Sequence, residues 1–531
     1  MEKDSLNVMP DDIQRLIGRE AQKSNILAAR TISEIVKTTL GPKGMDKMLV
    51  SQTNEVTITN DGATILKEMQ IEHPAAKIMV DIAKTQESEV GDGTTSVVMI
   101  AGKLLENAEK LLNQKVHPIS IINGYKLAEK KCQEFLNELS ININEDDDSL
   151  LKKIAITSMT GKGAESLKEQ LSEIALNAIK QIKDENIDLS NIKIQKIKGS
   201  SIYETKLILG MILDKERISK DMPERIENAK IALFDIGLEI RNPEIETKIS
   251  ISSPEQLENF IEQEERFIRE IVKKIVENKV NVIFCQKGVD EFAQYLLSKE
   301  KIYVCRRVSR SDMEKISRAT GAKIITNLDE LSESQLGYAE SVEERKEDQE
   351  YYTYINGCKN PKSLTILIRG TNDYLLDEIE RALEDALGVI SSSIKTKKIV
   401  LGAGATDIEL SKMLKDFNKT VQGKEKLAVE EFANSLEFIP LTLSENAGLD
   451  PIEILTELKT RHENNEGEAG INLLTNKIEN IKDSMIFEPY RVKSQAISSA
   501  TEAAIMILRI DDVIAAKEEK FNNRNQLDDY E

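Results

Sequence analysis

The chain of 531 residues holds few of the side chains that form the commonest catalytic and metal sites. Its three histidines make histidine catalysis and histidine-bound metals poor candidates. Its four cysteines are scattered without paired spacing, which predicts reduced thiols and argues against a disulfide framework or a zinc site. The cysteines are Cys132, Cys285, Cys305 and Cys358.

Long apolar runs and several common motifs are also missing. No run approaches the ~18 apolar residues that a membrane span needs, and the amino end, Met1–Asp4, lacks a signal-peptide pattern. There is no GxxxxGK[ST], no kinase signature and no GxGxxG after a strand, which argues against P-loop, kinase and dinucleotide-binding proteins. The 92 acidic and 72 basic residues give a net charge of −20, which disfavours a nucleic-acid partner. We therefore expect a cytoplasmic protein without membrane or nucleic-acid partners.

What the sequence does contain is a segment rich in glycine and hydroxyls, Val90–Ser96, directly before the apolar run Val97–Ala101. Gly91 and Gly93 permit positive φ and a close approach of the backbone to a ligand. The N–H groups of a helix start, with hydroxyls beside them, form a cradle for an anion, and Asp92 within it is a candidate Mg²⁺ ligand. The segment predicts a nucleotide-phosphate site. A capped helix start after a tight turn is the alternative that the segment alone leaves open.

The chain changes texture along its length and exceeds what one core usually supports, so several domains are expected. Residues 1–143 alternate amphipathic helices with glycine turns, and 142–148 is a polar, acidic candidate boundary. Between 280 and 325 short apolar strands alternate with helices, which predicts a small α/β domain with a parallel sheet. A helix with an acidic, solvated first half is expected from the N-cap Ser253 to about Lys279, preceded by a strand at 246–251. Further expected elements are helices at 19–39, 375–390 and 407–416 and strands at 56–59, 192–197 and 362–370.

More glycine turns accompany the first one. They lie at Thr39–Gly44, Thr59–Thr64, Val400–Ala405 and Gly470–Asn472, followed by Ile486–Pro489. Together with Asn60–Leu66, Ala83–Gln86 and Arg491–Ala496, this set, in this order, resembles the group II chaperonins, the family of the archaeal thermosome and the eukaryotic cytosolic chaperonin. The resemblance runs from about Gln14 to Ala516.

The resemblance implies a multidomain α/β chaperonin fold. A mainly helical equatorial domain is expected from both chain ends, residues 1–143 and 401–531. An α/β intermediate domain is expected from 144–212 and 366–400, and an α/β apical domain from 213–365. In group II members the apical domain carries a helical lid protrusion, here at about 238–267. The polar tail at about 517–531 is expected to be disordered.

The resemblance also implies a site for ATP and Mg²⁺. Asp92 matches the metal ligand, and Asp61 and Asp385 match the carboxylates that act on the attacking water. On helical period alone Asp385 is a surface carboxylate, with Glu384 as its competitor. Lys162 matches a γ-phosphate-sensing loop, although a plain turn lysine has the same local sequence. The nucleotide-contacting positions are Thr39, Leu40, Gly41, Pro42, Asn60, Gly93, Thr94, Thr95, Ser96, Gly161, Lys162, Gly404, Asn472 and Glu488.

One position departs from the family, which often has three glycines where this chain has Gly402, Ala403 and Gly404. Alanine adds a methyl group and restricts φ. If Gly404 makes the close approach, Ala403 is harmless. If Ala403 lies against the ribose, nucleotide affinity falls.

The function that the resemblance implies is that of an ATP-dependent chaperone subunit. Non-native proteins would be captured inside one of two stacked rings of about eight identical or sister subunits, and ATP-driven closure of the lid would enclose them. The alternatives are a ring member with weak or no ATPase and a non-chaperone ATP-using enzyme. The presence of Asp61, Asp92 and Asp385 argues against the first, and the missing kinase and P-loop motifs argue against the second.

Overall fold

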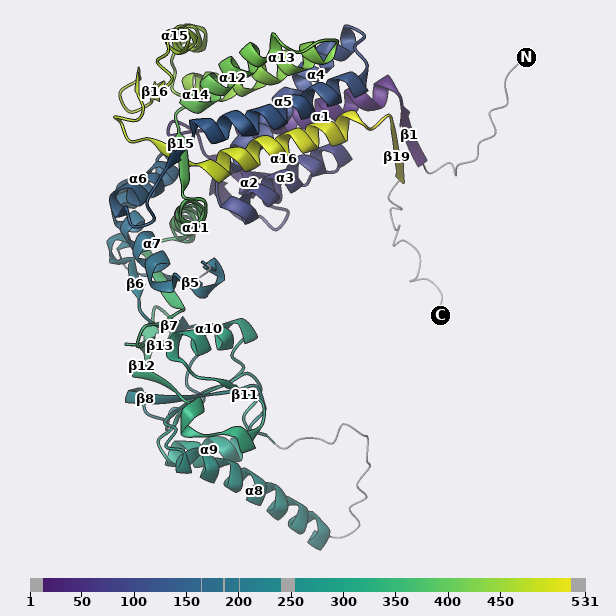
Figure 1. Ribbon diagram of the computed structural model, residues 1–531. Coiled ribbons are helices and arrows are strands. Elements are labelled where there is room, and N and C mark those ends of the chain that lie inside the picture. The colour runs from purple at the N-terminus through teal and green to yellow at the C-terminus, as the bar shows by residue number, and fades with distance from the viewer. Residues whose placement is uncertain (1–12, 164, 185–186, 200, 240–253, 517–531) are drawn as a thin grey trace, which may run out of the picture. The chain divides into compact units, whose positions relative to one another are not determined.

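A computed structural model describes residues 13–163, 165–184, 187–199, 201–239 and 254–516 of the chain. It divides into two compact units (Figure 1). Unit 1 combines residues 1–144 with 396–531, so the two chain ends fold together, and unit 2 comprises residues 145–395. The finer division into equatorial, intermediate and apical domains stays a prediction.

Unit 1 is mainly helical. Its helices are α1 (Arg19–Lys37), α2 (Gly62–Glu68), α3 (Pro74–Val90), α4 (Thr94–Asn113), α5 (Pro118–Leu139), α12 (Ala405–Asn418), α13 (Glu425–Leu436), α14 (Phe438–Asn446), α15 (Pro451–Glu463) and α16 (Tyr490–Leu508). Its strands are β1 (Ile13–Ile17), β2 (Lys47–Val50), β3 (Val56–Thr59), β4 (Ile141–Asn142), β15 (Lys398–Leu401), β16 (Ala469–Asn472), β17 (Lys477–Asn480), β18 (Phe487–Pro489) and β19 (Asp512–Ala516).

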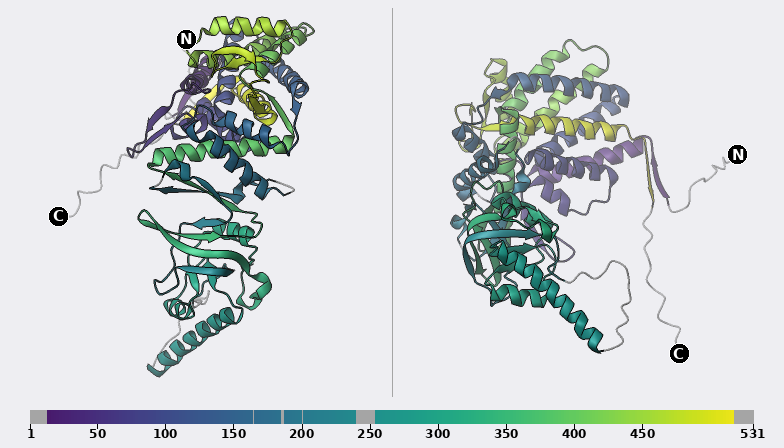
Figure 2. Two further views of the ribbon diagram at one scale, coloured as in Figure 1. Left: turned by 90° about the vertical axis from the view of Figure 1, so that its left-hand side faces the viewer. Right: turned by 60° about the horizontal axis from the view of Figure 1, so that its bottom comes forward.

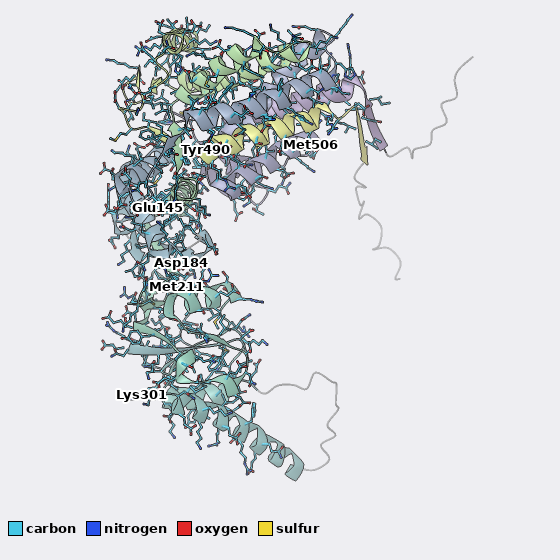
Figure 3. All side chains as sticks on the ribbon, in the orientation of Figure 1. Glu145, Asp184, Met211, Lys301, Tyr490 and Met506 are labelled. Atoms are coloured by element: carbon cyan, nitrogen blue, oxygen red, sulfur yellow. The ribbon has the colours of Figure 1, made fainter. Side chains whose placement is uncertain are left out.

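Helix α4 is the centre of the unit 1 core. The apolar run Val97–Ala101 is buried at every position, and a helix that is apolar all round belongs in an interior. Helices α1, α3, α13 and α16 pack around it. In Figures 1 and 2 the long helices α1, α5 and α16 run alongside one another. Tyr490 and Met506, labelled in Figure 3, lie at the start and in the last turn of α16.

Among the described residues, unit 1 has three sheets of only two strands, and two of these sheets carry large exposed apolar side chains. β1 pairs with β19, Ile13 opposite Ala516, and β2 pairs with β3. The β1–β19 pair projects away from the helices in Figures 1 and 2. Its Ile17 and Ile514 side chains are more than half exposed, as are Met48 and Val50 on β2.

Unit 2 contains both helices and strands. Its helices are α6 (Asp148–Met159), α7 (Lys168–Ile182), α8 (Pro254–Glu277), α9 (Glu291–Lys299), α10 (Arg310–Thr320) and α11 (Asp373–Thr396). Its strands are β5 (Ile192–Lys198), β6 (Lys206–Ile208), β7 (Met211–Leu213), β8 (Arg225–Phe234), β9 (Val282–Cys285), β10 (Tyr303–Cys305), β11 (Ile324–Ile325), β12 (Gly337–Glu347), β13 (Glu350–Asn356) and β14 (Leu364–Gly370).

The large sheet of unit 2 corrects one expectation. Its order is β10-β9-β8-β12-β13-β7, with β11 also on β8. β9, β10 and β11 are parallel strands as predicted, and they are joined through β8, which the sequence analysis did not predict. β12, β13 and β7 pair antiparallel, so the sheet is mixed. The charged second half of β12 hides its strand pattern from the sequence. α8 and α9 contribute to the apolar core on one face of the sheet, and α10 to the core on the other.

Most other expected elements are present within a few residues of their predicted ends. α3 begins at Pro74, where the missing N–H of proline costs little, and the Nδ1 atom of the N-cap His73 accepts a hydrogen bond from the Ala75 N–H. Three predictions fall wholly or partly outside the described residues: the strand at 246–251 with the N-cap Ser253, residues 240–253 of the predicted lid protrusion at 238–267, and the tail at 517–531. Within the described part of the chain, no helix is long and apolar enough to cross a membrane.

Candidate functional site

The predicted phosphate segment forms a helix start with two left-handed glycines. α3 ends at Gly91 with φ 75°, and Gly93, with φ 81°, is the N-cap of α4. Because Gly93 has no side chain, the first turn of α4 has no side-chain cap from this residue. The first N–H groups of α4, on Thr94, Thr95 and Ser96, lack carbonyl partners from a preceding helical turn, and the helix dipole makes this end attractive to an anion.

The Asp61 turn lies directly against this helix start. Asp61 is the N-cap of α2, where its Oδ2 accepts a hydrogen bond from the Thr64 N–H at 2.7 Å. Its Oδ1 accepts a hydrogen bond from the Thr94 hydroxyl at 3.0 Å. A Cβ on Gly62 would lie only 2.7 Å from the Thr95 Oγ1. Two segments separated by about thirty residues in sequence are thus in contact, and the neighbouring Asn60 is buried.

Asp92 provides a partly exposed carboxylate at the same place. Its Oδ1 accepts a hydrogen bond from the Gly93 N–H at 2.7 Å. No cluster of three or more histidine, cysteine, aspartate or glutamate side chains occurs in the part of the chain that the structure describes. Mg²⁺ takes one or two protein carboxylates and completes its shell with water and phosphate oxygens. The donor set therefore fits Mg²⁺ brought in with a nucleotide better than a resident metal held by protein alone.

The Thr39–Pro42 turn is held by helix α14 from the other end of the chain. Asn446 donates hydrogen bonds to the carbonyls of Lys37 and Leu40, at 3.1 and 2.9 Å. Gly41 has φ 80°, and a Cβ there would lie 2.4 Å from the Cδ2 atom of Leu443. The turn is therefore fixed against the C-terminal segment by a close approach that only glycine permits.

The Gly402–Gly404 turn faces Glu488. β15 and β18 pair antiparallel with Val400 opposite Glu488, and a Cβ on Gly402 would lie 3.1 Å from the Glu488 Oε1. Gly404 has φ 78°, and Ala403 also adopts the left-handed region, with φ 54°. The Ala403 carbonyl accepts a hydrogen bond from the Ile471 N–H. Ala403 therefore occupies a strained backbone position for a residue with a Cβ.

The Glu488 side chain belongs to a buried ion cluster that the sequence analysis did not predict. The Nζ atom of Lys493 lies 3.0 and 3.2 Å from the two oxygens of Asp407 and 3.2 Å from the Glu488 Oε2. The Lys493 and Asp407 residues are 5% and 1% exposed. Burial alone would lower the pKa of Lys493, but the two carboxylates outweigh it and raise that pKa. Burial raises the pKa of Glu488; Lys493 opposes this, while Asp407 and Asp92 add to it.

Asn472, at the end of β16, is occupied within its own hairpin. Its side-chain amide donates to the Glu479 Oε2 at 3.0 Å, and its Oδ1 accepts from the Leu474 N–H at 3.0 Å. Leu473 is buried in the core, whereas Leu474 is exposed. The structure brings the Asn472 strand next to Ala403 through the Ile471–Ala403 bond, and the role of the Asn472 side chain stays a prediction.

The remaining predicted residues lie in unit 2. Lys162, in the turn after α6, forms an ion pair with Asp385 of α11, and both side chains are less than one fifth exposed. Gly161 has φ 85°, and its N–H donates to the Glu165 Oε2 at 2.9 Å. Glu384 is exposed. Of the two neighbouring carboxylates on α11, Asp385 is therefore the one that faces the predicted phosphate-sensing lysine.

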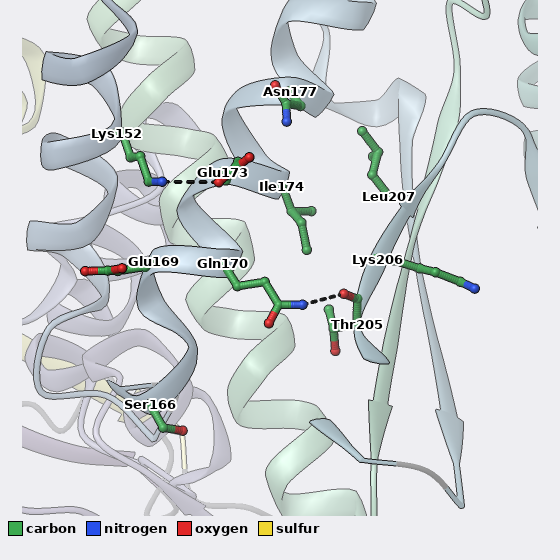
Figure 4. A pocket seen from close by; sticks show the side chains of 10 residues that line it. All are labelled: Lys152, Ser166, Glu169, Gln170, Glu173, Ile174, Asn177, Thr205, Lys206 and Leu207. Carbon is green, nitrogen blue, oxygen red and sulfur yellow. Dashed lines mark hydrogen bonds and ion pairs between the residues drawn. The ribbon is translucent and has the colours of Figure 1, made fainter. Parts of the chain in front are cut away.

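A cavity of about 600 Å³ in unit 2 contains none of the predicted site residues. Figure 4 shows its lining from α6, α7 and β6. Lys152 pairs with Glu173 at 3.3 Å, and the Gln170 amide donates to the Thr205 carbonyl at 2.8 Å. Because these charged and amide groups are matched to one another, the cavity does not compete with the predicted site in unit 1.

Comparison with known proteins identifies the family of the chain. The model of the TCP-1/cpn60 chaperonin family matches residues 32–518. The beta subunit of the thermosome of Archaeoglobus fulgidus is 53% identical over 515 residues, covering 96% of this chain and 94% of that one. Thermosome subunits of Pyrococcus horikoshii and Methanopyrus kandleri are 52% and 51% identical; each match covers 96% of this chain, and it covers 94% and 95% of the relative. The chain therefore belongs to the TCP-1/cpn60 chaperonin family, in its group II, thermosome-like branch.

Proposed function

We propose that this chaperonin subunit binds and hydrolyses ATP with Mg²⁺ at the N-terminus of α4 and uses that cycle to fold non-native proteins. One observation carries the proposal. The Asp61 carboxylate contacts the Thr94 hydroxyl, and Asp92 lies two residues before Thr94, so a carboxylate stands on each side of an uncapped helix start. Phosphoryl transfer needs such a combination of anion-holding N–H groups, a metal ligand and a group that orients water.

Each residue has a separate task in this proposal. The N–H groups of Thr94, Thr95 and Ser96 hold phosphate oxygens, and Gly93 lets the backbone approach them closely. Asp92 is the protein ligand of Mg²⁺, which supplies charge neutralisation at the transferred phosphate when bound. Asp61 orients the attacking water, because its Oδ1 already engages a hydroxyl of the phosphate-holding turn.

We assign the other predicted contacts to the same nucleotide. Glu488 influences the same electrostatic environment as Asp92, and we assign it, with Gly404 and Asn472, to the ribose and base. Thr39, Leu40, Gly41, Pro42 and Asn60 complete the nucleotide pocket as apolar and backbone contacts. Lys162, Gly161 and Asp385 keep the roles that the family resemblance implies, γ-phosphate sensing and activation of water. We also propose a cytoplasmic location.

Assembly into two stacked rings of identical or sister subunits is part of the proposal. An isolated two-stranded sheet is marginally stable, and an unpaired strand edge is a template for another strand. The β1–β19 and β2–β3 pairs expose apolar residues such as Ile17, Ile514 and Met48. We assign these two sheets to contacts between neighbouring subunits.

The experiment is steady-state ATP turnover with a matched pair of variants. Asp92→Asn should lower the turnover by roughly 100-fold, because it removes the metal-binding charge. Asp81→Asn, an exposed aspartate on α3, should leave turnover unchanged. Refolding of a chemically denatured protein should require ATP and fail with Asp92→Asn. If wild-type protein binds ATP but does not hydrolyse it, the alternative of an inactive ring member is correct.

A further inference from the structure

Gln86, on α3, is a fully buried amide that touches the phosphate turn from inside the core. It is 0% exposed. Its Nε2 donates to the Asp92 carbonyl at 2.8 Å and to the Val492 carbonyl at 3.1 Å. The second bond spans 406 residues of sequence and reaches the first turn of α16. One side chain thus connects the phosphate turn to the C-terminal part of the chain.

The orientation of this amide is fixed by its neighbours. Both groups within reach of Nε2 are carbonyl oxygens, which only accept, so the NH₂ group must face them. The Gln86 Oε1 finds no hydrogen-bond partner among the described residues. A buried, unsatisfied acceptor is costly. An apolar side chain would avoid the cost of the buried, unsatisfied Oε1. Gln86 carries that cost and in return makes the two hydrogen bonds to Asp92 and Val492.

The turn that Gln86 holds is rich in glycine. Asp92 lies between Gly91 and Gly93, both in the left-handed region, and glycine loses more conformational freedom on ordering than any other residue. A Cβ on Gly93 would lie 2.9 Å from the Val492 Cγ1 and 3.0 Å from the Gln86 Nε2. The turn is packed directly onto Gln86 and Val492, and the residue after Val492 is Lys493, which holds Glu488.

We propose that Gln86 is a positioning residue of the nucleotide site: by holding the Asp92 carbonyl, it directs the Asp92 carboxylate to the metal and keeps the phosphate turn in register with α16. This inference rests on the proposed ATP site. Gln86 itself touches no ligand in this arrangement. Because it acts on the metal-binding residue, its loss weakens Mg²⁺-dependent binding more than binding of the nucleotide without metal.

Gln86→Met tests the proposal, because methionine has a similar volume and no donor. Gln133→Met is the matched control. The Gln133 Nε2 also donates to an α16 carbonyl, that of Ser494, at 2.9 Å, and the Gln133 Oε1 accepts from the Ser494 hydroxyl. Gln133 lies on α5, and these two bonds do not involve the phosphate turn. ADP binding is measured by calorimetry with Mg²⁺ and with a chelator. Amide hydrogen exchange of residues 91–96 is measured on the ligand-free protein.

For Gln86→Met we expect the dissociation constant for ADP with Mg²⁺ to rise roughly 10- to 100-fold, with a smaller rise in chelator and faster exchange at 91–96. For Gln133→Met we expect ADP binding and the amide exchange of residues 91–96 to match wild type. Equal binding by Gln86→Met and wild type, or an equal loss with and without Mg²⁺, overturns the proposal. If Gln86→Met does not fold, Gln86→Asn, whose amide is one carbon too short, replaces it in the same comparison.

The failure of the inference and that of the proposed site give different results. If wild-type protein does not bind ADP with Mg²⁺, the nucleotide site itself is wrong and the inference falls with it. If wild type binds and Gln86→Met binds equally well, only the role of Gln86 is wrong.

Discussion

Removal of the buried Lys493 charge should strongly destabilise unit 1. In Lys493→Met, Asp407 and Glu488 lose the cation that contacts three of their oxygens at 3.0–3.2 Å. Breaking a buried ion pair by removing one partner costs about 3–5 kcal/mol, because a charge is left without compensation. Asp407, at 1% exposure, cannot recover its hydration without local opening. We therefore expect the free energy of unfolding to fall by about 3–5 kcal/mol.

The assay is urea unfolding followed by circular dichroism at several pH values. Lys419→Met, at the residue directly after α12, is the control. The side chains of Lys419 and its partner Asp416 are 78% and 61% exposed, and such pairs contribute about 0–1 kcal/mol. Burial already raises the pKa of Glu488 and Lys493 lowers it, so that pKa rises further in the variant. A carboxyl group whose pKa is raised in the folded state destabilises the fold at pH values above that pKa, and this loss of stability disappears as the pH falls. The deficit should therefore narrow towards acidic pH. A deficit under about 1 kcal/mol at neutral pH, or one that widens on acidification, would refute the reasoning.

The remaining predictions concern backbone strain, hydrolysis and pH. Ala403→Gly should raise the free energy of unfolding in urea by about 0.5–1 kcal/mol, because relief of the left-handed alanine outweighs the added entropy of glycine in the unfolded chain. Gly404→Ala should lower the free energy of unfolding, and a destabilising Ala403→Gly would contradict the reasoning. Asp385→Ala should lower ATP turnover by roughly 10²- to 10⁴-fold while ATP still binds. Glu384 is exposed, and Glu384→Ala should leave turnover unchanged. Unchanged turnover in Asp385→Ala would remove the role assigned to Asp385. Burial lowers the pKa of His73, and its Nδ1 accepts a helix-capping bond, so the stability that this cap contributes above pH 6.5 should be lost as the pH falls below 6.5. His73→Asn supplies a cap that does not titrate and should flatten the dependence of stability on pH. An unchanged pH profile would exclude His73 as the source of that dependence.

Local sequence signals predicted the part of the site that a single turn or helix start can encode. Gly93 appears as the N-cap of α4 and Asp61 as the N-cap of α2, both within motifs visible in the sequence. The contact between Asp61 and Thr94 required the family resemblance, because periodicity does not pair distant turns. The structure shows that contact directly.

The groups missed by sequence reasoning are those that act across the fold. Gln86 and Val492 are 406 residues apart, and Lys493 and Asp407 are 86 apart. A buried lysine or glutamine has no local signature that distinguishes it from a surface residue on the same helix. The antiparallel strand β12 was missed for a local reason, since the charged residues of its second half resemble those of a loop.

The most direct test of the account is an experimental structure of the protein with Mg²⁺ and a non-hydrolysable ATP analogue. The account predicts phosphate oxygens on the N–H groups of Thr94–Ser96, the metal on the Asp92 carboxylate, and Asp61 facing the γ-phosphate. A nucleotide bound elsewhere, or phosphates at this helix start with the metal away from Asp92, would contradict it.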